Sequence, residues 1–225
     1  MEKQVKVIMA VACALACTLA SVRAQTVSVT VDPAQSWIGY MNVSNLPADG
    51  GAYQFGSAWG TGDLQASFAG TTLTLAPNIN VWETTDTYWV KADGISPNKN
   101  MDAAMYVEND AWAGSTVDFT GFTLANTLVS PYTSTAFIRD FVPDYSSFTT
   151  VTAALVPGVG WNISLPTTAG DHIQYGFETI GPDANPLTAA ALGNVEVTAV
   201  PEPSSIALVL AGLSGLVMFV RKSRV

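Results

Sequence analysis

Short runs in which polar and apolar residues alternate fill the chain between its two ends. Residues 26–31 read Thr-Val-Ser-Val-Thr-Val, which puts three valines on one face of an extended strand, and residues 161–165 alternate in the same way. Between residues 26 and 200, no long segment shows the 3.6-residue apolar period of a helix. The pattern predicts strands near 26–31, 37–43, 64–68, 72–76, 87–91, 103–108, 116–124, 136–142, 149–155, 161–165, 173–179 and 194–198.

Turn-forming residues separate these runs, for example Asp93-Gly94, Pro157-Gly158 and Gly181-Pro182. About a dozen short strands with such turns predict one all-β domain, an antiparallel β-sandwich of jelly-roll type. A single helical turn is expected at 187–192, because Pro186 precedes this segment and Gly193 ends it. The glycine-rich segment 50–62 also contains aromatic residues, which argues against a plain linker.

The N-terminal segment has the pattern of a secretory signal peptide. A basic start with Lys3 and Lys6 precedes the apolar residues 7–20, and Val22-Arg23-Ala24 places small residues before a cleavage point. We therefore expect residues 1–24 to be removed, so that the exported domain comprises residues 25–199.

Both cysteines, Cys13 and Cys17, lie inside this apolar segment, so the exported domain has no cysteine and forms no disulfide bond. Acylation of Cys17, as in a lipoprotein, is the alternative. The preceding Ala14-Leu15-Ala16 fits the sequence requirement of that modification poorly.

A second apolar segment closes the chain. Residues 206–220 carry no charge, and with two preceding serines they predict a transmembrane helix at about 204–220. Fifteen residues of helix span about 22 Å, less than the ~30 Å hydrocarbon core, so this anchor is short. Arg221, Lys222 and Arg224 follow it and place that end in the cytoplasm.

The order of Pro201-Glu202-Pro203, a short apolar span and a basic tail resembles the PEP-CTERM sorting signal of Gram-negative bacteria. The same region is also catalogued as an ice-binding protein C-terminal domain. The resemblance covers residues 200–225 and implies Pro201, Glu202 and Pro203 as a recognition motif for exosortase, a membrane-embedded sorting enzyme. It further implies export by the Sec translocon, an inner-membrane precursor, and release to the cell surface or an exopolysaccharide matrix.

Charge narrows the choice of ligands. Residues 26–200 contain three cations against sixteen acidic residues, and the whole chain has a formal net charge of −9. Such a surface repels phosphate backbones, which excludes nucleic acid as a partner. Calcium, which takes oxygen ligands, stays open. None of the acidic residues shows EF-hand spacing, and the candidate ligands are Asp93, Glu108, Asp110, Glu178 and Asp183.

No set of catalytic residues stands out. His172 is the one histidine of the chain, and its neighbour Asp171 would point to the opposite face of a strand. A Gly-x-Ser-x-Gly motif is absent, and a domain without cysteine cannot form a Cys-His pair or an ordinary zinc site. A glycoside hydrolase needs two carboxylates roughly 5 to 10 Å apart, and sixteen acids supply such a pair by chance. We therefore expect no enzyme.

Tryptophan suggests a different role, because an exposed indole can stack on the apolar face of a sugar ring. Trp37, Trp89 and Trp161 lie within predicted strands and are assigned to the core. Trp59 and Trp112 lie in predicted loops and are the candidates for stacking on a glycan.

Together these features predict an exported, membrane-anchored protein that exosortase then processes. Its β-sandwich would serve adhesion, structure or glycan binding without catalysis. The alternative is a secreted carbohydrate-active enzyme on the same fold. Ice binding is a third hypothesis, but regular Thr-x-Thr strands are missing beyond residues 71–74.

Overall fold

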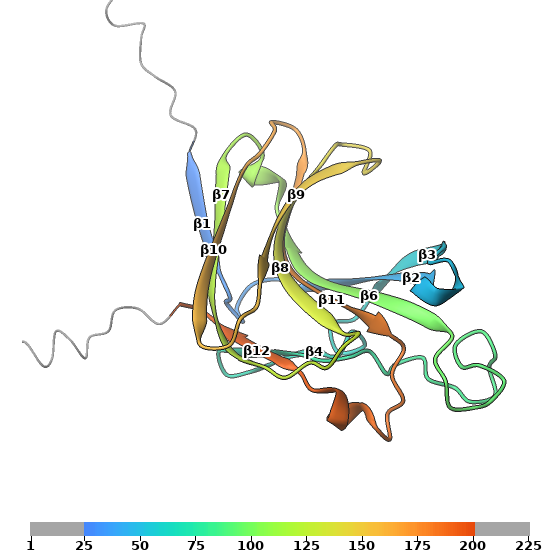
Figure 1. Ribbon diagram of the computed structural model, residues 1–225. Coiled ribbons are helices and arrows are strands. Elements are labelled where there is room, and N and C mark those ends of the chain that lie inside the picture. The colour runs from blue at the N-terminus through green and yellow to red at the C-terminus, as the bar shows by residue number, and fades with distance from the viewer. Residues whose placement is uncertain (1–24, 201–225) are drawn as a thin grey trace, which may run out of the picture.

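Two six-stranded β-sheets pack face to face in the computed structural model, which describes residues 25–200 (Figure 1). In sheet A, β7 pairs with β1, β10 and β12, and the sheet continues from β12 through β5 to β4. Its strands are β1 (Thr26–Thr30), β4 (Ala66–Ala69), β5 (Thr72–Leu75), β7 (Thr116–Asn126), β10 (Val159–Pro166) and β12 (Val195–Thr198).

Sheet B is antiparallel throughout, in the order β3-β2-β6-β11-β8-β9. The central strand β11 is buried along most of its length, as expected for a strand flanked on both sides. The strands of sheet B are β2 (Ile38–Asn45), β3 (Tyr53–Trp59), β6 (Lys99–Glu108), β8 (Thr133–Phe141), β9 (Phe148–Ala154) and β11 (His172–Pro182).

The predicted β-sandwich is confirmed, with three differences. The pair β1–β7 is parallel, because β1 runs alongside β7 from Thr26 opposite Thr116 to Thr30 opposite Thr120. The prediction of a strand at 87–91 is wrong. Most of these residues lie in turns, and only Val90 pairs, in an isolated bridge with Pro97. Strand β3 was not predicted, and it lies within the glycine-rich segment 50–62.

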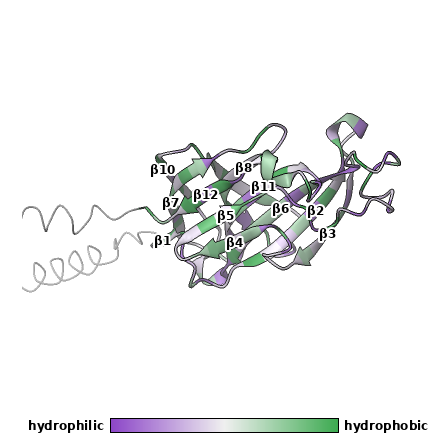
Figure 2. Ribbon diagram, turned by 90° about the horizontal axis from the view of Figure 1, so that it is seen from below, coloured by the Kyte–Doolittle hydropathy of each residue, from purple (hydrophilic) through white to green (hydrophobic). Residues whose placement is uncertain are grey.

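Aromatic rings fill the space between the sheets. Trp161, Ile163 and Leu165 of β10 are buried while their neighbours are exposed, as the alternation predicted. Phe119 lies 4.7 Å from Trp161 and 5.5 Å from Phe177, measured between ring centroids. Figure 2 shows hydrophobic and hydrophilic residues alternating along the strands. Strands within residues 26–198 enclose this core, so we expect residues 25–200 to fold as one unit.

Among residues 25–200, helix is confined to three single turns, η1 (Pro47–Asp49), η2 (Asp110–Trp112) and η3 (Ala189–Leu192). The helical turn expected at 187–192 is thus present, and it ends at Gly193 with φ +78°. Within residues 25–200, no helix is long and apolar enough to cross a membrane. The predicted signal peptide 1–24 and the predicted transmembrane helix at about 204–220 lie outside the described residues.

The two ends of the described chain lie on the same side of the sandwich. Figures 1 and 2 place the start of β1 and the residues after β12 on the side opposite β2 and β3. The part of sheet B that contains β2 and β3 therefore points away from both chain ends.

Gly176, in the middle of β11, permits close contact with β6. A methyl group here would overlap the carbonyl oxygen of Met105 and lie 2.6 Å from the Cα atom of Tyr106. We expect Gly176→Ala to lower the free energy of unfolding by about 1 to 3 kcal/mol, the usual cost of overpacking, as measured by urea denaturation. Gly62→Ala is the control, because its methyl group would enter open space. Equal effects of the two changes would contradict this explanation.

Candidate functional site

A groove of about 950 Å³ crosses the outer face of sheet B. Successive side chains of a strand point to opposite faces of the sheet. In β6, the even-numbered residues from Asn100 to Glu108 therefore line the groove, whereas Met101, Ala103, Met105 and Val107 face the core. Polar and aromatic side chains predominate in its lining, which includes Tyr40, Asn42, Ser44, Tyr53, Asn100, Asp102, Ala104, Tyr106, Glu108, Arg139, Phe141, Tyr145, Phe148, Thr150, Thr152, Gln174, Glu178 and Ile180.

Exposed aromatic rings stand at the two opposite edges of the groove. Tyr53 belongs to the edge strand β3 and is 64% exposed, and Phe148 belongs to the other edge strand β9 and is 49% exposed. Tyr145, in the turn between β8 and β9, adds a third exposed ring. Such rings offer flat apolar surfaces with polar groups beside them, an arrangement suited to a sugar chain.

The floor of the groove contains a compact group of charges. The guanidinium of Arg139 on β8 forms an ion pair with Glu178 on β11 and lies 4.0 Å from the ring centroid of Phe137. Asp102 on β6 lies beside Glu178. The side-chain amide of Asn42 on β2 donates a hydrogen bond to the Asp102 carboxyl group at 3.5 Å. Four strands thus supply one network in which a single cation faces two carboxyl groups.

The surroundings of Asp102 disfavour its ionised form. Burial raises its pKa to about 7, and the negative charge of Glu178 and a hydrogen bond shared with that carboxyl group act in the same direction. Arg139 and Asn42 act in the opposite direction. Below this pKa, Asp102 therefore carries a proton.

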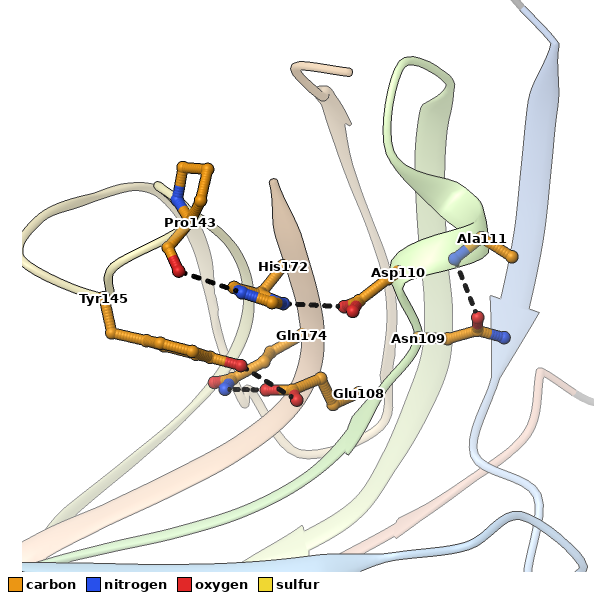
Figure 3. Close-up of polar contacts among 8 residues, drawn as sticks. All are labelled: Glu108, Asn109, Asp110, Ala111, Pro143, Tyr145, His172 and Gln174. Atoms are coloured by element: carbon orange, nitrogen blue, oxygen red, sulfur yellow. Dashed lines mark hydrogen bonds and ion pairs between the residues drawn. The ribbon is translucent and has the colours of Figure 1, made fainter. Parts of the chain in front are cut away.

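A second group of polar residues lies at one end of the groove. Figure 3 shows the imidazole of His172 between the carbonyl of Pro143 and the carboxylate of Asp110, and the nitrogen-oxygen distances are 3.2 and 3.0 Å. The ring of Tyr145 stacks on His172, with 4.3 Å between centroids and an interplanar angle of 7°. Glu108 accepts hydrogen bonds from the Tyr145 hydroxyl at 3.2 Å and from Gln174 at 2.6 Å.

This group, which we name the His172 clamp, holds the turn between β8 and β9 in place. Tyr145 has φ +57°, a conformation that is unfavourable for a bulky residue and that needs support from its surroundings. One ligand atom each of Glu108, Asp110 and His172 lies within 4.8 Å of the others, a spacing that also suits a metal. However, both ring nitrogens of His172 face oxygen acceptors, and the doubly protonated ring that donates to both has no lone pair for an ion.

The His172 clamp makes a prediction about pH. The hydrogen bond to Asp110 raises the pKa of His172 above the ordinary 6.5, and the Pro143 carbonyl and the charges of Asp110 and Glu108 add to this shift, although partial burial opposes it. Since the folded state raises the pKa, the stabilisation is complete below about pH 6.5 and is lost as pH rises through the raised value. Because the chain has one histidine, its NMR titration reports this pKa without ambiguity.

We expect a pKa above 6.5 in the wild-type protein and a return toward 6.5 in Asp110→Asn, which removes the charged acceptor. Amide exchange in the turn that carries Tyr145 should quicken over the same pH range. A wild-type value at or below 6.5 would show that the ring is not held as an imidazolium.

The tryptophans chosen from sequence lie elsewhere. Trp59 ends β3, where its indole nitrogen donates to Ser57 at 2.9 Å, and Trp112 lies in η2 with its ring 5.5 Å from that of Tyr175. Both rings are half-buried against the core, and neither lines the groove.

The five calcium candidates do not form one cluster, although Glu108 and Asp110 lie together beside His172. Glu108, Asp110 and Glu178 take part in the contacts described above. Asp93 accepts hydrogen bonds from the backbone of Ile95 and Ser96 in an exposed turn. Asp183 is buried at the end of β11, far along the strand from His172.

Apart from Glu108 and Glu178, which were candidates for calcium, the sequence analysis did not single out the residues of the groove. Four of these residues lie on four different strands: Tyr53, Asp102, Arg139 and Phe148. The alternation of polar and apolar residues within each strand indicated only which side chains face solvent. One signal was available: Arg139 is one of three cations in residues 26–200 and lies within a predicted strand.

The structure is thus a β-sandwich that carries a groove edged by exposed aromatic rings. Its tail is more specific, because a family model described as the PEP-CTERM protein-sorting motif matches residues 199–224. This confirms the resemblance seen at Pro201-Glu202-Pro203, and the match covers the tail alone. Such a motif implies an exported precursor that is processed by an exosortase-type enzyme to a cell-surface form.

Comparison of the whole chain adds little. A search of the curated proteins finds no match. Among solved structures, the chain is similar to the N-terminal endo-1,4-beta-D-xylanase 10B of Clostridium thermocellum, in a structure of its CBM22-1 and GH10 modules complexed with xylohexaose. Identity is 10%, the TM-score is 0.26, and the match covers 60% of this chain and 26% of that one. A likeness this small carries no conclusion about fold or ligand.

Proposed function

We propose that this protein is a surface or matrix protein whose β-sandwich binds an uncharged polysaccharide in the groove of sheet B. The N-terminal segment 1–24 would act as signal peptide and the segment at about 204–220 as membrane anchor, until an exosortase processes the chain in a Gram-negative bacterium. The observation that carries the proposal is the groove itself, with exposed aromatic rings at both edges and hydrogen-bonding groups on its floor.

The shape of the groove supports an extended ligand. Its lining comes from all six strands of sheet B, so a chain of sugar rings can lie across it. The rings of Tyr53 and Phe148 are available for stacking at either end, and carboxylate and amide groups between them can bind hydroxyls.

The charges of the groove support a neutral ligand. Among the residues that line it, Arg139 is the one cation, and Glu178 already pairs with it. Asp102 and Glu108 add further carboxyl groups. A polymer of uronic acids would be repelled, whereas the hydroxyls of a neutral sugar can donate to these carboxylates.

The orientation of the domain fits this function as well. Both ends of the described chain lie on the side opposite β2 and β3, so a body tethered at its C-terminal end presents that part of sheet B outward (Figure 1).

Catalysis on the same fold is the competing hypothesis. The two carboxyl groups on the groove floor, Asp102 and Glu178, interact, because the negative charge of Glu178 raises the pKa of Asp102. A glycoside hydrolase uses two such groups to flank the scissile bond. A hydrolase would release reducing ends from the polysaccharide, and a binding domain would not.

The test is retention of purified residues 25–200 on polysaccharides, by affinity gel electrophoresis and glycan arrays. We expect retention by one or more neutral glucans, mannans or galactans, none by alginate or polygalacturonate, and no release of reducing ends. Absence of retention on every polysaccharide would refute the binding function.

Processing has its own test. In native cells that contain an exosortase, the mature protein should lack both residues 1–24 and the apolar tail after Pro201-Glu202-Pro203, as intact-mass spectrometry would show. An intact tail in membranes of such cells would contradict it.

A further inference from the structure

Asp183, the first residue after β11, is a buried carboxyl group without a hydrogen-bond donor. It is 1% exposed, and neither Oδ1 nor Oδ2 has a hydrogen-bond partner among the described residues. An ionised carboxylate in such surroundings is strongly unfavourable unless a cation or donors compensate it. The surroundings of Asp183 therefore need a group that neutralises the charge.

The neighbouring lysine does not supply that group. Lys99 begins β6, beside the end of β11, and its backbone carbonyl accepts a hydrogen bond from the Asp183 amide at 3.0 Å. Its Nζ donates to the carbonyl of Asn98 at 3.3 Å and lies 4.5 Å from the centroid of the Tyr88 ring. The ammonium group thus makes its contacts elsewhere and forms no ion pair with Asp183 within the described residues.

Two backbone carbonyl groups lie beside the backbone of residues 183 and 184. The Ala184 amide donates to the carbonyl of Asn78 at 2.7 Å, as the Asp183 amide does to that of Lys99 at 3.0 Å. A carbonyl oxygen has two lone pairs, so accepting one of these hydrogen bonds does not by itself prevent contact with a cation. Asn78 is itself buried, and its side chain is held by the Asp63 carbonyl at 2.7 Å and the Asn80 amide at 3.1 Å.

A proton is the competing explanation. Burial raises the pKa of Asp183 to about 7, although the amide of Ala184 opposes this shift, so a proton neutralises the carboxyl group below that value. Above that value, a hard divalent cation that prefers oxygen ligands would compensate the charge.

We propose that Asp183 binds a calcium ion together with backbone carbonyl oxygens, and the carbonyls of Asn78 and Lys99, which bond to the amides of residues 184 and 183, are the candidates. The ion joins the end of β11 to the irregular segment 76–98, which has one isolated bridge as its sheet pairing. Of the five acidic residues that the sequence offered for calcium, the structure thus selects Asp183, because it alone is buried with both oxygens free.

The test uses residues 25–200 stripped with EDTA and then given Ca²⁺. We expect one bound Ca²⁺ per chain by mass spectrometry of the metal content. At a free concentration about 100 times the dissociation constant, the melting temperature should rise by about 5 to 10 °C. Asp183→Asn keeps the shape of the side chain and should abolish the rise and the bound metal. Glu196→Gln, which removes one negative charge from β12, should leave both unchanged.

A wild-type protein without bound Ca²⁺, or a rise in melting temperature that Asp183→Asn retains, would overturn the proposal. Should Asp183→Asn fail to fold, hydrogen-deuterium exchange of the wild-type protein decides. Protection by Ca²⁺ in peptides covering 76–80, 97–100 and 181–186 would support the site. Protection confined to peptides around Glu108 and Asp110, or no protection at all, would overturn it.

Discussion

Replacing Phe177 by alanine is expected to lower the free energy of unfolding by about 3 to 5 kcal/mol. Phe177 lies on the central strand β11 and is fully buried. Its ring centroid lies 5.5 Å from that of Phe119, 5.9 Å from that of Trp161 and 6.2 Å from that of Trp37. Deletion of the phenyl group removes these contacts and leaves a cavity that strands on both sides prevent from closing.

Urea denaturation of residues 25–200 measures this effect. A loss of this size is a large fraction of the 5 to 15 kcal/mol that usually stabilises a domain. Phe177→Leu keeps most of the apolar volume and should cost less than about 1.5 kcal/mol. Phe148→Ala makes the same chemical change on the exposed edge of the groove and should cost less than about 1 kcal/mol. Similar losses for Phe177→Ala and Phe148→Ala would mean that the aromatic cluster is not the centre of the core.

The second large effect concerns the groove. We expect Tyr53→Ala and Phe148→Ala each to weaken binding of the neutral polysaccharide about 10-fold, and the double variant to weaken it about 100-fold. The two rings stand on opposite edge strands of sheet B, so their contributions should add. Titration calorimetry with the polysaccharide identified by the retention assay would measure the affinities.

The variants should keep the melting temperature of the wild-type protein within a few degrees, because neither ring is buried. Leu187→Ala removes a side chain that is 92% exposed and lies outside the groove, and it should leave the affinity unchanged. Unchanged affinity in the double variant would place the binding surface outside the groove.

The course of individual strands shows where sequence patterns suffice. Trp161, Ile163 and Leu165 could be assigned to one buried face because a strand repeats every two residues wherever it lies. Segment 87–91 has the composition of a strand, with threonine, tyrosine, tryptophan and valine, yet it forms turns. Here Trp89 packs against Phe55, and the Asp86 carboxylate binds the Tyr88 amide at 2.9 Å, so local turn contacts replace sheet pairing.

Strand β3 shows the opposite error. Its glycine-rich surroundings lower the intrinsic preference for strand, but β2 offers an edge with which it pairs from Gly39–Trp59 to Ser44–Tyr53. Gly56 is needed in that pairing, because a methyl group there would lie 2.7 Å from the ring of Tyr40. Pairing with β2, rather than the intrinsic preference of its residues, therefore makes this segment a strand.

The candidate site could not be predicted for a related reason. Asp102, Arg139 and Glu178 are separated by tens of residues, and only the register of β6, β11 and β8 brings them together. The two tryptophans expected to bind a glycan were chosen from local sequence, which does not report how far a ring is covered by another sheet. Phe148 and Tyr53 stay exposed because they lie on edge strands, a property of strand order rather than of composition.

By itself, the sequence determined the all-β class and the sorting motif at Pro201-Glu202-Pro203, because alternation and a linear signal are both local patterns. Only the tertiary structure decided which outward-facing residues form the groove, which histidine contacts hold its end, and which of five acidic residues is buried without a partner. These properties depend on contacts between residues far apart in the chain, and such contacts exist only after both sheets have formed and packed.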